Sequence, residues 1–143
     1  MASHPRSILV ITGPTGIGKT DLAMRLADDS PLRIISADSV MVYRHLDIGS
    51  AKPSASELER YPHDLIDLVE PEYPFDVGQY LFHAKRSIQC AWQRNEVPCL
   101  VGGTILYLKS LLDGLDPLPK ADPDIRKRIR EKAEQQGWPA IHG

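Results

Sequence analysis

Residues 13–20 have the sequence Gly-Pro-Thr-Gly-Ile-Gly-Lys-Thr, and no other feature of this chain restricts its fold as strongly. They match the pattern G-x-x-x-x-G-K-[ST]; the apolar run 7–12 precedes them, and apolar positions at helical spacing follow from Thr20. A glycine-rich loop between a strand and a helix turns successive backbone amides toward a polyphosphate, and the helix N-terminus adds partial positive charge. The sequence therefore predicts a phosphate-binding loop.

Every residue of this loop is a candidate for binding the substrate phosphates. Lys19 is expected to neutralise the terminal phosphate, and the Thr20 hydroxyl can be a ligand of Mg²⁺. The pattern alone does not identify the molecule that carries the phosphate. The predicted phosphate-binding residues are Gly13, Pro14, Thr15, Gly16, Ile17, Gly18, Lys19 and Thr20.

Strands and helices are predicted to alternate along the chain. Short apolar runs predict strands over residues 33–36 and 97–101, and alternating apolar positions indicate a further strand over residues 63–69. Apolar residues at three- and four-residue steps predict helices over residues 76–95, with Asp at the N-cap, and 106–113. This alternation is typical of parallel βαβ units, so we expect a doubly wound parallel α/β sheet.

The pattern changes after residue 115, and we predict two regions on this basis. Residues 1–115 form the phosphate-binding core, and residues 116–143 form a proline-marked linker and the start of a helical RNA-binding insertion. Because the chain stops without a further strand, the sheet is expected to be incomplete. A basic helix predicted over residues 125–132 is a candidate for contacting RNA phosphates. The alternative is a helix whose charged face is simply exposed to solvent, which is equally common for such a sequence.

Composition excludes several classes of protein. With 42% hydrophobic and 25% charged residues among 143, the chain is neither disordered nor fibrous, and two cysteines exclude a disulfide framework. The net charge of −2 does not by itself predict a nucleic-acid partner. The apolar run 8–11 is too short to span a bilayer, so we expect a cytoplasmic monomer without membrane contact.

Asp38 lies just beyond the predicted strand 33–36, at the edge where open α/β sheets gather their ligands. Its position beside the phosphate loop makes it the natural general base if a nucleophile loses a proton during attack. The alternative is that this carboxylate only caps the turn after the strand.

The predicted strand 97–101 ends in Gly-Gly-Thr, where a nucleotide-hydrolysing relative would present an Asp for magnesium and water. We therefore expect a site that binds a bulky ligand closely and does not position a hydrolytic water. Thr104 offers a hydroxyl at the sheet edge; its alternative role is a helix N-cap. His63 has no partner at a suitable spacing, and we assign it no role.

Taken together, the motifs resemble the N-terminal half of the bacterial tRNA dimethylallyltransferases, also called tRNA isopentenyltransferases. The blocks occur in family order over nearly the whole chain, which is much more specific than the phosphate loop alone. The family-like blocks are residues 13–20, 35–39, 42–43, 47–53, 62–63, 65–67, 101–104, 106–107 and 119–126.

The resemblance implies that the loop grips the diphosphate of dimethylallyl diphosphate. The dimethylallyl group would then move to the exocyclic amine of the adenosine 3′ to the anticodon, in the anticodon stem-loop of tRNA. By position, Asp38 would be the base on that amine and Thr20 would hold Mg²⁺. The residues implied to contact tRNA are Asp38, Ser39, Val40, Met41, Thr104 and Arg126.

Two other functions remain open from the residues themselves. One is a small kinase that phosphorylates a nucleoside or metabolite with ATP, in which Asp38 accepts the proton of a hydroxyl. The other is a phosphate-binding fragment without catalytic activity.

Overall fold

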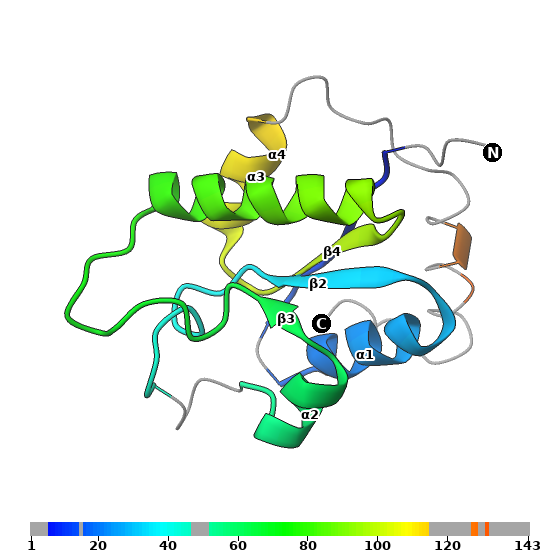
Figure 1. Ribbon diagram of the computed structural model, residues 1–143, viewed down its shortest axis with the longest axis horizontal. Helices are drawn as coiled ribbons and strands as arrows, with labels where there is room; N and C mark the ends of the chain where they lie inside the picture. Colours follow the sequence, from blue (N-terminus) through cyan, green and yellow to red (C-terminus); the bar gives the residue numbers. More distant parts are fainter. Residues whose placement is uncertain (1–5, 15, 47–51, 115–126, 129–130, 132–143) are drawn as a thin grey trace.

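The computed structural model describes residues 6–14, 16–46, 52–114, 127–128 and 131. Its strands form one parallel sheet in the order β1-β4-β2-β3, which confirms the predicted α/β class (Figure 1). The predicted linker and insertion helix, 116–143, lie outside the described residues except at 127–128 and 131. The elements are β1 (Leu9–Ile11), α1 (Lys19–Asp29), β2 (Leu32–Ser36), α2 (Ala55–Arg60), β3 (His63–Asp64), α3 (Val77–Gln93), β4 (Val97–Val101) and α4 (Ile105–Asp113).

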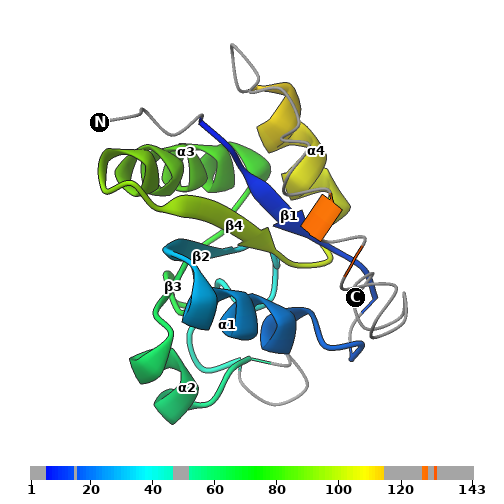
Figure 2. The ribbon, with the colours of Figure 1, turned by 90° about the vertical axis from the view of Figure 1, so that its right-hand side faces the viewer.

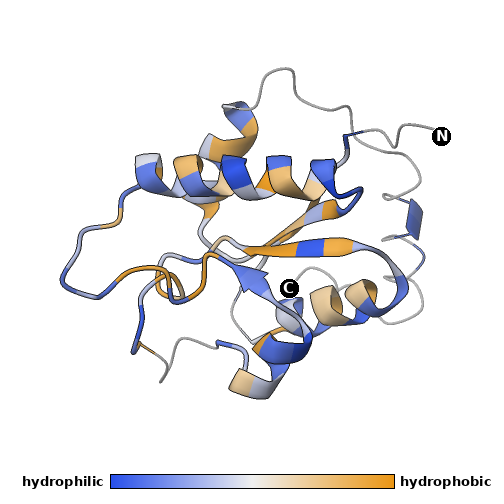
Figure 3. Cartoon of the chain, viewed as in Figure 1, coloured by the Kyte–Doolittle hydropathy of each residue, from blue (hydrophilic) through white to orange (hydrophobic). Residues whose placement is uncertain are grey.

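Helices cover both faces of the sheet (Figure 2). α1 packs on one face, where buried Leu22 and Met24 meet apolar side chains of β1, β2 and β4. α3 and α4 pack on the other face around a second cluster that contains Ile88 and Leu111. Hydrophobic residues run along β2 and β4, whereas the helices alternate between hydrophobic and hydrophilic residues (Figure 3). In the described part of the chain, no helix combines the length and apolar character needed to cross a bilayer.

The start of α3 follows the sequence prediction. Asp76 Oδ1 accepts a hydrogen bond from Gln79 N at 2.8 Å, and Gln79 Oε1 accepts one from Asp76 N at 2.9 Å. These reciprocal bonds form a capping box, which satisfies two amides that the helix itself leaves unbonded. The same arrangement begins α2, between Ser54 and Glu57. Both helix starts are thus fixed by contacts within four residues.

The strand predicted over residues 63–69 is wrong in length. β3 has two residues, because Leu65 and Asp67 have φ angles of 68° and 54°, which an extended strand does not permit. Further along, Val69 forms an isolated parallel bridge with Tyr43, outside the strands of the sheet. The segment after β3 is therefore a pair of left-handed turns.

β1 covers only three of the six residues predicted in 7–12. Ser7 lies before the strand, and its carbonyl accepts a hydrogen bond from Trp92 Nε1 at 3.2 Å. A side chain of α3 thus binds the backbone here.

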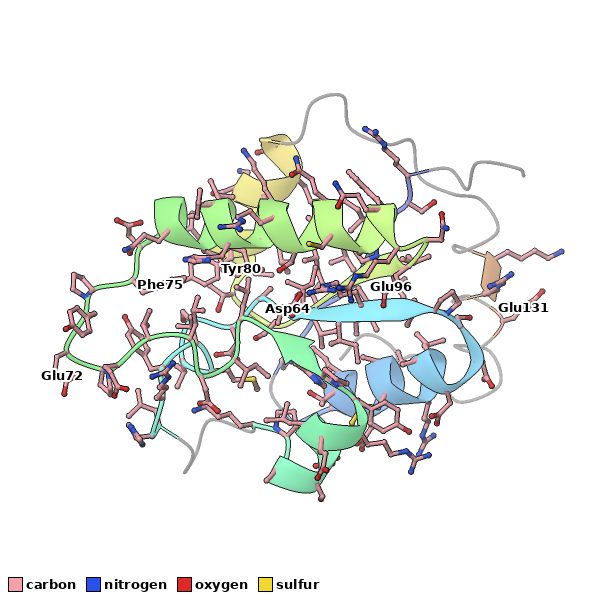
Figure 4. The ribbon with its side chains drawn as sticks, viewed as in Figure 1. Asp64, Glu72, Phe75, Tyr80, Glu96 and Glu131 are labelled. Atoms are coloured by element: carbon pink, nitrogen blue, oxygen red, sulfur yellow. The ribbon has the colours of Figure 1, made fainter. Side chains whose placement is uncertain are left out.

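Tyr80 connects α3 to the carboxyl end of β2. Its hydroxyl donates to the Ser36 carbonyl at 2.9 Å, and its ring stacks on Tyr107 with centroids 4.1 Å apart. Figure 4 shows Tyr80 pointing from α3 toward the sheet. Burial raises the pKa of the Tyr80 hydroxyl, so the group remains a hydrogen-bond donor. The end of β2 is consequently held from the α3 face.

β2 and β4 come into close backbone contact just past their ends. A Cβ atom on Gly102 would lie 2.2 Å from the Ala37 carbonyl oxygen, so only glycine fits there. Ala37 N donates to Val101 O at 2.8 Å, and Thr104 N donates to Ala37 O at 3.1 Å. The backbone of Ala37 therefore requires glycine at position 102, a contact that the sequence did not predict.

We predict that Gly102→Ala destabilises the protein by about 1–3 kcal/mol or more, because the new methyl group forces the β2 and β4 ends apart. The measurement is the free energy of unfolding in urea. Gly78→Ala is the comparison, since its Cβ would meet only the Asp76 carboxylate, at 3.3 Å. A Gly102→Ala protein as stable as Gly78→Ala would contradict the close contact.

Candidate functional site

The loop between β1 and α1 has the backbone geometry of an anion-binding turn. Gly13, Gly16 and Gly18 have φ angles of 150°, 89° and 92°. A Cβ atom on Gly16 or Gly18 would meet nothing within 4 Å, so these positions require glycine for its φ angle and not for space. Gly18 is the N-cap of α1, and no side chain caps the helix there. The amides at this helix N-terminus are thus left available for an anion.

The side chain of Lys19 is hydrogen-bonded to the backbone of the glycine-rich loop. Its Nζ donates to the carbonyl oxygens of Gly13 at 2.7 Å and Pro14 at 2.8 Å. Burial lowers the pKa of Lys19, and the negative charge of Asp38 opposes this shift. The ammonium group therefore lies at the mouth of the loop, with a carboxylate nearby.

Asp38 forms the turn that follows β2. Its Oδ1 accepts hydrogen bonds from Val40 N at 2.8 Å and Met41 N at 3.0 Å. The turn-capping role considered for this residue is therefore present. Since one oxygen makes both bonds, these contacts leave the second carboxylate oxygen for a ligand.

Thr104 joins the loops that follow β2 and β4. Its Oγ1 accepts a hydrogen bond from Ser39 N at 2.9 Å and lies 3.4 Å from Ser39 Oγ. Thr104 occupies the N-cap position of α4, but its side chain makes no capping bond. The hydroxyl thus orders the loop that contains Asp38 and does not cap the helix.

The buried side chain of Lys52 fixes the segment that follows Asp38. Lys52 Nζ donates to Tyr43 O and to Asp67 Oδ1, both at 2.6 Å, and the Lys52 side chain is 5% exposed. Asp67 N in turn donates to Met41 O at 3.0 Å. The segment from Met41 to Tyr43 is thereby bound to the turns after β3.

These elements enclose a pocket of about 280 Å³. The glycine-rich loop and the start of α1 line it together with Asp38, with Pro53 before α2 and with residues at β3 and just after it. Its polar and charged residues are accompanied by Met41, Pro53 and Ile66, so some of its wall is apolar. The lining residues are Gly16, Gly18, Lys19, Thr20, Asp21, Ser36, Asp38, Met41, Pro53, His63, Ile66, Val101 and Gly102.

His63 lines this pocket, although the sequence offers no reason to assign it a role. Its Nδ1 lies 2.6 Å from the Tyr61 carbonyl, which can only accept, so Nδ1 carries the proton. Burial lowers the pKa of His63, against the opposing effects of this hydrogen bond and of the carboxylates of Glu57 and Asp64. His63 is therefore a neutral imidazole whose Nε2 is an acceptor.

The structure brings together much of the predicted site but not all of it. Lys19, Thr20 and Asp38 line one pocket, as the sequence predicts, and Met41 joins them. Val40 does not line the pocket and is 45% exposed. Thr15 and Arg126 lie outside the described residues.

Sequence reasoning missed Ser36 and His63. The pairing of β2 with β3 sets His63 opposite Ile34, and the two-residue period of strands puts Ser36 on the same face as Ile34. This pairing joins two strands that are far apart in the sequence, so no local pattern indicates it. The available signal was the position of His63 within one of the family-like blocks.

Fold and site together define an α/β protein in which a glycine-rich loop at a helix N-terminus and the carboxylate of Asp38 line one pocket. Two family models narrow this class: one described as IPP transferase matches residues 41–143, and one described as isopentenyl transferase matches residues 6–67. Since the first match alone covers more than half of the chain, the chain belongs to the IPP transferase family.

Individual relatives agree with this assignment. A "tRNA dimethylallyltransferase" of Acidithiobacillus ferrooxidans is 49% identical over 134 residues, which are 94% of this chain and 42% of the relative. A "tRNA dimethylallyltransferase 2" of Hahella chejuensis is 49% identical over 138 residues, 96% of this chain and 41% of the relative. The chain thus spans about two fifths of the length of these curated relatives.

Solved structures show the same fold. The crystal structure of a full-length tRNA isopentenylpyrophosphate transferase from Bacillus halodurans matches with a TM-score of 0.73 and 35% identity, over 92% of this chain and 44% of that protein. A structure of a eukaryotic dimethylallyltransferase acting on tRNA matches with a TM-score of 0.71 at 24% identity, over 95% of this chain and 39% of that one. This second likeness is one of fold only.

We predict that His63 makes the protein sensitive to acid. The unfolded chain binds a proton at His63 near the ordinary pKa of 6.5, whereas the folded chain binds it only at lower pH, so the free energy of unfolding falls as pH falls below about 6.5. His63→Asn, whose amide can still donate to Tyr61 O, removes this contribution to the loss. Urea unfolding of the wild type and of His63→Asn at pH 7.5 and 5.5 measures this loss of stability. An equal loss of stability in the two proteins would contradict the prediction.

Proposed function

We propose that this chain carries the diphosphate grip and the catalytic carboxylate of an enzyme that modifies tRNA. The enzyme transfers a dimethylallyl group from dimethylallyl diphosphate to the exocyclic amine of the adenosine 3′ to the anticodon and releases diphosphate. The observation that carries the proposal is the single pocket that Lys19 and Thr20 of the phosphate loop line together with Asp38. The names of the relatives support the choice of substrate class.

The chemistry follows from the two sides of the pocket. The amine nitrogen attacks the first carbon of the dimethylallyl group, and the bond from that carbon to the diphosphate oxygen breaks. The nitrogen gives up a proton to the Asp38 carboxylate, whose Oδ1 is already bonded to two backbone amides, so the other oxygen is the acceptor. Lys19 and the N-terminal amides of α1 stabilise the charge that develops on the diphosphate. The adenosine reaches this pocket by leaving its base stack.

The residues present fit a magnesium ion held jointly with the substrate. Among the described residues there is no cluster of three or more His, Cys, Asp and Glu side chains that would hold a metal alone. Thr20 at the pocket wall supplies a hydroxyl, and Mg²⁺ commonly combines one or two protein oxygens with substrate phosphates and water. When bound, the ion supplies positive charge to the departing diphosphate.

The kinase alternative shares the phosphate loop and Asp38 but has less support. The chain after β4 offers Gly102, Gly103 and Thr104, with no carboxylate to hold the magnesium of a nucleotide. The apolar wall of Met41, Pro53 and Ile66 suits a hydrocarbon group better than a ribose. These residues favour the prenyl diphosphate as ligand.

We expect calorimetry with Mg²⁺ to show binding of dimethylallyl diphosphate and much weaker binding of ATP. Lys19→Met should weaken the binding of dimethylallyl diphosphate by about ten- to a hundredfold, since the substitution removes a charge-assisted hydrogen bond that contributes about 1.5–3 kcal/mol. Preferential binding of ATP would favour the kinase. Binding of neither ligand would contradict the proposal and leave the chain without a ligand site of its own.

Two substitutions of Asp38 are expected to separate its roles. Asp38→Asn keeps the oxygen that caps the turn but cannot accept the proton, whereas Asp38→Ala loses both. In a chimera that joins this chain to the C-terminal region of the Acidithiobacillus relative, we expect both variants to slow prenyl transfer to tRNA about 10²- to 10⁴-fold. Affinity for dimethylallyl diphosphate should stay close to wild type in Asp38→Asn. Unimpaired transfer by Asp38→Asn would remove Asp38 from the chemistry.

A further inference from the structure

Two buried polar atoms on the α1 face of the sheet have no hydrogen-bond partner in the described part of the chain: Ser36 Oγ and His63 Nε2. Both residues line the pocket that holds Thr20 and Asp38. A buried polar atom without a partner costs about 1–3 kcal/mol, so proteins rarely keep one unless something else satisfies it. Two such atoms beside one pocket point to a ligand.

The fold places these two residues on one face of the sheet. In the parallel pairing of β2 with β3, Ile34 lies opposite His63, and Ser36 follows two residues later on the same face. This is the face that α1 covers, since Ile34 packs with Leu22 and Met24 of α1. Ser36 and His63 therefore lie toward α1, whose first turn contains Thr20.

The chemistry of the two atoms defines the ligand. His63 Nδ1 is committed as a donor to Tyr61 O, so Nε2 of the neutral ring can only accept. Ser36 Oγ accepts as well as donates. Water bound to a divalent cation is a strong donor, and Mg²⁺ usually keeps several of its waters when it binds beside substrate phosphates. Neither atom can neutralise a phosphate, so a second anion site does not fit.

We propose that Ser36 Oγ and His63 Nε2 form an outer-shell seat for a hydrated divalent cation, accepting hydrogen bonds from its water ligands while Thr20 and the substrate diphosphate bind the ion directly. The inference rests on the proposed function, because it needs a diphosphate in the loop. It adds to that function two positioning residues that act on the cation through water. It also explains why the end of β2 carries a buried serine and the start of β3 a neutral histidine, each with an unpartnered polar atom.

The test measures cation binding and not turnover. Mn²⁺ serves as the probe, with water proton relaxation reporting its binding to the wild-type chain saturated with inorganic diphosphate. We expect Ser36→Ala and His63→Asn each to weaken Mn²⁺ binding about tenfold or more, which is the usual effect of losing a partner in the second shell of a metal. His63→Gln, which can return an oxygen acceptor near the position of Nε2, should recover some of the affinity.

Matched controls separate this role from a structural one. Ser87→Ala and His83→Asn change the same residue types on α3, on the opposite face of the sheet, and should bind Mn²⁺ as the wild type does. Ser36→Ala should unfold at the same or a higher urea concentration than the wild type, since it removes an unpartnered hydroxyl. A loss of Mn²⁺ affinity in this variant therefore cannot come from unfolding.

The outcomes distinguish this inference from the proposed function. If the wild-type chain binds diphosphate and Mn²⁺ together, and Ser36→Ala and His63→Asn bind them equally well, the seat is overturned and the proposed function stands. If the wild-type chain binds no diphosphate with or without Mn²⁺, the proposed function falls, and the seat falls with it. Weakened Mn²⁺ binding in both variants, with diphosphate affinity in the absence of metal unchanged, supports the seat.

Discussion

The backbone contact between the ends of β2 and β4 is the constraint on which the rest of the site depends. Gly102 lets the two strand ends approach closely. The Ala37 amide then donates a hydrogen bond to the Val101 carbonyl, and the Ala37 carbonyl accepts one from the Thr104 amide. The loop carrying Asp38 is thereby registered against β4, and β4 is registered against β1 and the phosphate loop. The position of the glycine-rich loop relative to the Asp38 carboxylate is a property of three adjacent strands.

Electrostatic attraction between opposite charges adds to this arrangement. The Lys19 ammonium and the Asp38 carboxylate attract each other across the pocket, while each is anchored by backbone groups of its own loop. Lys52 has a similar role further from the phosphate loop, where its buried ammonium bridges Tyr43 and Asp67. Partial burial strengthens such pairs, because fewer water molecules screen them. The site is consequently ordered by charge as well as by hydrogen bonding.

Local patterns predicted the regions of the molecule that depend on local contacts. The glycine-rich loop, the N-cap at Asp76 and the turn capped by Asp38 are formed by residues within a few positions of one another, and the structure has them where the sequence predicts. One failure concerns a local backbone conformation and the other a contact between distant segments. The left-handed turn at Leu65 ends β3 early, and the pairing of His63 with Ile34 brings a histidine into the pocket. Register between strands far apart in sequence leaves no periodic trace, so periodicity could not place His63 in the pocket.

The two carbonyl contacts of Lys19 also affect how fast a ligand can bind. A free lysine side chain samples many rotamers, and fixing it costs up to about 2 kcal/mol of conformational entropy. Here the loop's own carbonyls, at Gly13 and Pro14, have already fixed the ammonium at the mouth of the loop. An arriving anion therefore meets a charge that needs little rearrangement, and capture is governed by diffusion and electrostatic attraction more than by reordering of the protein.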